Sequence, residues 1–207
     1  MKRCFTFAII ALILSSSLTM FGSLRTLHQM KISKEEYAVY SAVISNMFAG
    51  GKVTFDTQAK VKLLVITDHT ITTLRAFPVE NQDWKYLKER LPEVSQKMFN
   101  DFAAKNKEVQ KLKDNFEIEL KRTLIKKDEI EEIFKDRENG WERFYKSFPD
   151  SGGFIGFSRV VFNVEKKQAL VYMEHNCHDL CASGHFVLLK KGKEGWVVEK
   201  GYMPWIS

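Results

Sequence analysis

The chain has 207 residues, which is enough for one well-buried domain and short for two. Hydrophobic residues make up 44% and charged residues 28%, and the four prolines and eleven glycines argue against long disordered linkers. The formal net charge is +6, and removal of Lys2 and Arg3 with a leader would lower it by two. So small a positive charge does not indicate a nucleic-acid-binding protein.

Residues 1–22 have the layout of an export signal. The basic pair Lys2 and Arg3 precedes an apolar stretch from Cys4 to Leu14, and the small polar residues Ser15 to Ser17 follow. A signal peptide has this order, and its apolar stretch is shorter than the roughly 20 residues of a spanning helix. Further apolar residues could extend the stretch into a membrane anchor. We therefore predict a periplasmic or secreted protein, with anchoring to the inner membrane through this segment as the alternative.

Residues 23–207 are expected to form a single α+β domain, in which 33–150 is mainly helical with short strands. Helical spacing of apolar residues predicts a helix over 33–49, with Ser33 as its N-cap. The further elements expected in this part are a strand over 61–67 that residues 70–74 continue or pair with, a helix over 91–107, a strand over 115–125, and short helices over 128–135 and 141–148.

Residues 151–207 change character and are predicted to form an antiparallel sheet. Several β-rich runs follow one another, and the connections between them are too short for helical crossovers. The runs cover 154–162, 169–174, 185–190 and 196–206. The chain should therefore end in an antiparallel meander of about four strands.

The segment 175–185 reads His-Asn-Cys-His-Asp-Leu-Cys-Ala-Ser-Gly-His and gathers chemically active side chains. An export signal would place Cys177 and Cys181 in an oxidising compartment, where two cysteines four residues apart most simply form one disulfide. The chain-entropy model assigns about 2 kcal/mol of stabilisation to closing so short a loop.

A metal site in the same segment is the alternative. Zinc and copper accept imidazole and thiolate ligands, but a disulfide would remove both thiolates. The spacing matches no standard zinc module, so no metal cofactor is expected, and zinc or copper would be the candidates. A thiol–disulfide exchange role would need a reactive thiolate at the start of a helix, which the sequence does not offer. The histidines concerned are His175, His178 and His185.

His69 and Glu174 are candidates for acid–base chemistry, and His175 is a third. His69 follows Asp68, whose carboxylate could orient the imidazole, although a histidine with a local hydrogen bond is the commoner outcome. The sequence has no nucleophile elbow, phosphate loop or zinc-protease motif. These residue types alone therefore do not identify a reaction.

Four short motifs follow one another toward the C-terminus: S-R-V-x-F-N, A-L-V-Y, C-x-x-L-C-x-x-G and W-I-S. This pattern resembles the ends of a group of uncharacterised bacterial exported proteins, in which the cysteine loop is commonly glycine-rich. The resemblance implies export and a strand-rich ending, and it implies no activity. The loop histidines depart from that pattern, which weakens the metal hypothesis. The matching residues are Ser158–Val160, Phe162, Asn163, Ala169–Tyr172, Cys177, Leu180, Cys181, Gly184, Leu188, Leu189, Trp196 and Trp205–Ser207.

The sequence thus predicts an exported envelope protein that binds an envelope protein or a small ligand without catalysing a reaction. Two alternatives stay open: a hydrolase-type envelope enzyme that uses histidine and glutamate as acid–base groups, and a metal-binding module built on the histidine and cysteine loop. No nucleic-acid partner is expected.

Overall fold

The computed structural model describes residues 31–48, 61–72 and 81–207, and the expected leader over 1–22 lies outside these ranges. Residues Lys31–Ser207 form one compact unit. In the described ranges the unit contains five helices and a seven-stranded sheet, which confirms the α+β class. No helix in those ranges is long and apolar enough to cross a membrane.

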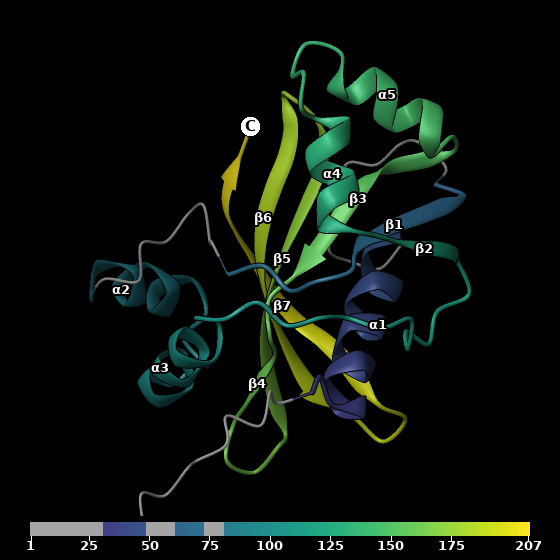
Figure 1. Cartoon of the computed structure of the whole chain (residues 1–207). Coiled ribbons are helices and arrows are strands. Elements are labelled where there is room, and N and C mark those ends of the chain that lie inside the picture. The colour runs from purple at the N-terminus through teal and green to yellow at the C-terminus, as the bar shows by residue number, and fades with distance from the viewer. Residues whose placement is uncertain (1–30, 49–60, 73–80) are drawn as a thin grey trace, which may run out of the picture. The chain divides into compact units, whose positions relative to one another are not determined.

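Figure 1 shows the elements in chain order. The helices are α1 (Lys34–Phe48), α2 (Asn81–Arg90), α3 (Gln96–Lys105), α4 (Lys127–Ile133) and α5 (Gly140–Ser147). The strands are β1 (Leu63–Thr67), β2 (Lys121–Ile125), β3 (Ser151–Phe157), β4 (Val161–Phe162), β5 (Gln168–His178), β6 (Cys181–Lys191) and β7 (Trp196–Ile206).

The sheet is mixed and has the strand order β2-β1-β3-β5-β6-β7, with β4 paired beside β5. β1 pairs in parallel with β2 and β3, whereas β3, β5, β6 and β7 pair antiparallel in succession. The predicted C-terminal meander is therefore confirmed. The prediction that residues 70–74 continue the strand over 61–67 or pair with it is wrong for residues 70–72, which form no strand, and residues 73 and 74 lie outside the described ranges.

Helix α1 covers one face of the sheet. Its buried side chains, including Tyr40 and Ile44, pack on apolar residues of β1, β3, β5 and β6 that point to this face, such as Val171. The ring of Tyr40 stacks on Phe157 with the ring centroids 4.7 Å apart. The 3.6-residue period of α1 thus matches the two-residue alternation of the strands.

The opposite face is covered by two separate helix pairs, which stand apart in Figure 1. Helices α2 and α3 pack on residues of β5 and β6 that include Leu170 and Phe186. Helices α4 and α5 pack on β1, β2 and β3 around Val65 and Ile125. The middle of this face lies between the two pairs.

A buried ion-pair network joins the helices of the two faces. Glu36 of α1 is 2% exposed and accepts hydrogen bonds from Arg159 Nε at 2.8 Å and Nη2 at 3.1 Å. Lys105 Nζ of α3 lies 3.2 Å from the same carboxylate. Burial raises the pKa of Glu36, but the hydrogen bonds of Arg159 and the charge of Lys105 outweigh that effect and lower it. The Glu36 carboxylate is therefore ionised inside the fold.

Several predicted boundaries differ from the structure. The helix expected over 91–107 begins only at Gln96, because the Ser95 side chain caps it by accepting a hydrogen bond from the Met98 backbone N–H at 3.1 Å. Of the strand expected over 115–125, only β2 forms. The sequence pattern also does not predict α2.

Candidate functional site

A cavity of about 290 Å³ opens on the middle of the sheet face between the two helix pairs. We call it the His69–Glu174 pocket, after the two acid–base candidates that line it. Its remaining walls come from the end of β1 and the residues after it, from β3 and β5, and from α4. The lining residues are Thr67, His69, Ile71, Lys127, Ile130, Glu131, Phe154, Gly156, Glu174 and Asn176.

The position of the pocket follows from the sheet topology. In open sheets, ligand sites form beyond the carboxyl ends of parallel strands. β1 ends at Thr67, so the next residues emerge at that edge, and α4 begins directly after the neighbouring strand β2. Gly156 of β3 pairs with Glu174 of β5. A Cβ atom at Gly156 would lie only 3.2 Å from Cγ2 of Ile71, so glycine allows the chain after β1 to pass closely over the sheet.

His69 is oriented by its neighbour. Its Nδ1 lies 2.9 Å from Asp68 Oδ1, and both side chains are mostly shielded from solvent. An ionised carboxylate can only accept a hydrogen bond, so Nδ1 carries the proton and the lone pair of the neutral ring is on Nε2. The hydroxyl of Thr67 donates to the His69 carbonyl at 2.7 Å and thus fixes the backbone at this position. The imidazole of His69 is therefore held in one orientation at the pocket.

Glu174 is 7% exposed and is also held by named hydrogen bonds. The Tyr172 hydroxyl donates to Glu174 Oε1 at 3.0 Å, and Trp205 Nε1 donates to that hydroxyl at 2.8 Å. Sequence reasoning missed Tyr172 and Trp205. Two signals point to them: Tyr172 lies two residues before Glu174 and so shares its face of the strand, and both residues belong to the C-terminal motifs.

The histidines of the 175–185 segment lie away from this pocket. His175 and His185 point to the α1 face, whereas His178 is exposed and stacks on the Trp141 ring, with centroids 6.0 Å apart and an interplanar angle of 18°. The structure thus does not bring the three imidazoles together. In the described residues, no three His, Cys, Asp or Glu side chains form a group that could hold a metal.

His175 and His185 are core residues. His175 Nε2 lies 2.6 Å from the Gly152 carbonyl, and His185 Nε2 lies 2.8 Å from the Ser183 hydroxyl. Burial lowers the pKa of His175, against a smaller opposing effect of the Gly152 carbonyl. Burial and then the charge of His175 lower the pKa of His185 to about 3. Both rings are therefore neutral near pH 7, and His175 does not contribute to the acid–base pair.

Cys177 and Cys181 form a disulfide, as predicted, with their Cα atoms 5.1 Å apart. The sequence indicates a loop around these cysteines, but the two strands extend into it, because β5 ends only at His178 and β6 begins at Cys181. Helix α5 fixes this hairpin end: Tyr145 donates to the Cys177 carbonyl at 2.6 Å. Leu180 at the tip is 86% exposed. The disulfide thus staples a hairpin whose end is already packed against a helix.

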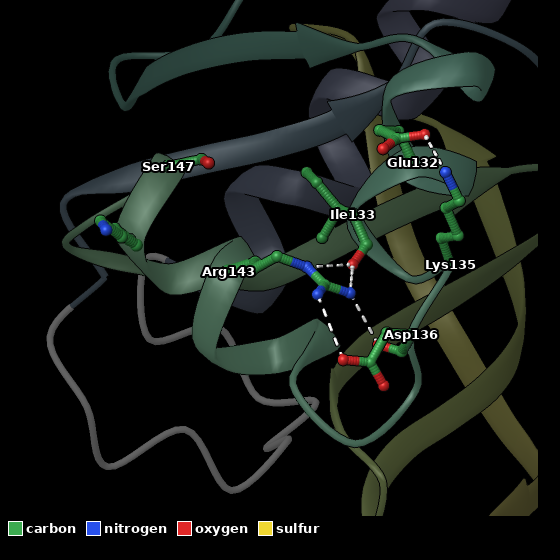
Figure 2. A pocket seen from close by; sticks show the side chains of 7 residues that line it. Glu132, Ile133, Lys135, Asp136, Arg143 and Ser147 are labelled. Atoms are coloured by element: carbon green, nitrogen blue, oxygen red, sulfur yellow. Dashed lines mark hydrogen bonds and ion pairs between the residues drawn. The ribbon is translucent and has the colours of Figure 1, made fainter.

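A second cavity, of about 410 Å³, lies between α4 and α5 (Figure 2). Arg143 points across it, and its guanidinium donates to the Ile133 carbonyl from Nε at 2.9 Å and to the Asp136 carbonyl from Nη2 at 2.7 Å. Arg143 Nη1 also lies 3.4 Å from the Asp136 carboxylate. Since the guanidinium satisfies carbonyl groups at the end of α4, this cavity is a helix junction and we assign it no ligand.

The comparisons with known proteins add no relative. No protein-family model matches the chain, and neither a curated protein nor a solved structure is similar to it. The His69–Glu174 pocket is therefore the feature of the molecule from which a function can be inferred.

Proposed function

We propose that the protein is an exported envelope protein that binds a small ligand in the His69–Glu174 pocket without turning it over. The observation that carries this proposal is the convergence of a fixed imidazole and a buried carboxylate on one cavity. Two features support the export part: the leader-like residues 1–22 and the disulfide, a bond typical of oxidising compartments.

The pocket is suited to a small molecule with an apolar body and polar groups. Its volume of about 290 Å³ is near the lower end of the range for ligand cavities. Ile71, Ile130 and Phe154 supply apolar walls, while Glu174 and Asn176 supply hydrogen-bonding groups on neighbouring positions of one strand face. Such a lining binds a ligand through apolar contact and orients it through a few polar groups.

A ligand screen on the purified full chain tests the binding function. We expect compounds that raise the melting temperature of the protein to lose this effect in Glu174→Gln and His69→Gln. Ser147→Ala, which changes the α4–α5 cavity instead, should keep it. Hits that bind equally well to both pocket variants would contradict the proposed site, and a screen in which no compound binds at this pocket would contradict the function.

The second candidate is an acid–base enzyme at the same pocket. The specific observation in its favour is that His69 and Glu174, the two residues singled out for such chemistry, line one cavity. His69 Nε2 would act as the base while Asp68 stabilises the imidazolium, and Glu174 would act on the opposite side of the substrate. Hydrolase assays separate the two candidates. Turnover that copurifies with the protein and disappears in His69→Gln or Glu174→Gln would replace the binding function by an enzymatic one.

A further inference from the structure

Three neighbouring strands place Glu174, Gly184 and Trp205 in one row. Glu174 of β5 pairs with Gly184 of β6, and Gly184 pairs with Trp205 of β7. The missing side chain of Gly184 leaves a space, and the Tyr172 hydroxyl and the Trp205 indole meet there. A Cβ atom at Gly184 would lie 2.2 Å from both Tyr172 Oη and Trp205 Nε1, so no other residue fits without displacing them.

The direction of the hydrogen bonds in this row is fixed by chemistry. An indole N–H can only donate, so the Tyr172 oxygen accepts from Trp205. The hydroxyl proton of Tyr172 then points to Glu174 Oε1. A donor that itself accepts a hydrogen bond is polarised and donates more strongly. The two hydrogen bonds therefore act as one relay that ends on the carboxylate in the pocket.

We propose that Tyr172 and Trp205 are positioning residues for Glu174, which hold its carboxylate in the His69–Glu174 pocket and link that pocket to the C-terminal strand. The proposal rests on the proposed function only where it treats the pocket as the binding site. Because Oε1 accepts the hydrogen bond of the Tyr172 hydroxyl, the orientation of the Glu174 carboxyl group in the pocket depends on that bond.

The tryptophan side-chain signals of the full chain test the relay without any ligand. The chain has four tryptophans, so a ¹H–¹⁵N spectrum contains four indole signals, which Trp→Phe variants assign. In Glu174→Gln the weaker acceptor loosens the Tyr172 bond, and the Trp205 indole proton should move to higher field. Tyr172→Phe removes the acceptor of Trp205 and should move the same signal further.

Trp196 provides a matched control on the same strand. Its indole donates directly to Glu35 Oε1 at 2.8 Å, at the opposite end of β7. Glu35→Gln should therefore shift the Trp196 signal and leave the Trp205 signal in place, and Glu174→Gln should do the reverse. This crossed pattern is a signature that general destabilisation of the protein does not produce.

The outcomes separate the relay from the proposed function. A Trp205 signal that does not respond to Glu174→Gln, or one that responds equally to Glu35→Gln, overturns the relay, whatever the ligand screen finds. A Trp205 signal that responds as expected supports the relay even if no compound binds, and in that case only the binding function fails. Where a hit is in hand, Tyr172→Phe should weaken its binding up to about tenfold, the loss expected for one hydrogen bond. Unchanged affinity would overturn the positioning role.

Discussion

Replacing His185 by leucine should make the protein less sensitive to acid. The His185 ring is 1% exposed and lies diagonally across the strand pair from His175, so a proton on it would place a positive charge inside the core. Burial and then the charge of His175 lower its pKa from 6.5 to about 3. Leucine has a similar size and removes the titrating group.

The size of the effect follows from the two pKa values. Because the folded-state pKa of His185 lies below the unfolded value, the neutral ring stabilises the fold fully above pH 6.5, and this contribution is lost as the pH falls toward 3. At pH 5 the imidazole is almost fully protonated in the unfolded chain and still neutral in the folded one. This difference lowers the free energy of unfolding by about 2 kcal/mol relative to neutral pH.

Urea unfolding followed by tryptophan fluorescence at pH 7.5 and pH 5 measures this contribution. The free energy of unfolding should decrease from pH 7.5 to pH 5 in both proteins. This decrease should be about 2 kcal/mol smaller in His185→Leu than in the parent chain. His178→Leu removes an exposed histidine from the same hairpin and controls for the loss of a histidine as such. Equal losses in the parent chain and in His185→Leu would refute the reasoning.

Three further changes test other parts of the structure. Glu36→Gln should lower the free energy of unfolding by about 3 kcal/mol or more, since it leaves buried cations without their carboxylate. Glu35→Gln, at a carboxylate that is only partly buried, is the control and should cost less, and urea titration measures both. Reduction of the Cys177–Cys181 bond, or its replacement by two serines, should lower that energy by about 2 kcal/mol, with intact mass reporting the redox state. Gly184→Ala should lower it by about 1 to 3 kcal/mol, because the indole and phenol above Gly184 must move. A melting temperature within error of the parent chain would contradict any one of these.

A helix or strand is predicted correctly where the spacing of its apolar residues alone shows which of its faces is buried. The helix over 33–49 and the C-terminal strands have apolar residues at the spacing of the face that they bury, and both form. The misread segment 115–120 has the alternation of a strand, but Phe116 packs against Tyr37 of α1 from an irregular segment, with ring centroids 5.3 Å apart. Alternation predicts which side chains are buried there and not which hydrogen bonds the backbone makes.

The pairing of distant strands could not be predicted in this way. β1 pairs in parallel with β2 and β3, both of which lie more than 50 residues further along the chain, and no local pattern encodes that choice. Helix α2 could not be predicted because it is mostly polar and shows no helical spacing of apolar residues. Leu87 is its one fully buried side chain among those described.

The candidate site was predicted in parts. His69 and Glu174 stand out individually by residue type, yet their meeting depends on the order β1-β3-β5 in the sheet. The disulfide was predictable because both partners lie within five residues of one another. Trp205 of β7 bonds to Tyr172 of β5, with β6 between these two strands. The spacing of residues along the chain does not predict such a contact.

The ion pairs of Glu36, Arg159 and Lys105 also determine how the molecule can open. A helix held on a sheet by apolar contacts alone can detach by itself. Detaching α3 would instead separate Lys105 from the buried Glu36 carboxylate, and detaching α1 would separate that carboxylate from Arg159. Detaching either helix alone thus leaves a buried charge without its partner. Detaching both helices together therefore costs less free energy than detaching them one at a time. The amides of α1 and α3 should therefore exchange with solvent deuterium in a single cooperative unit.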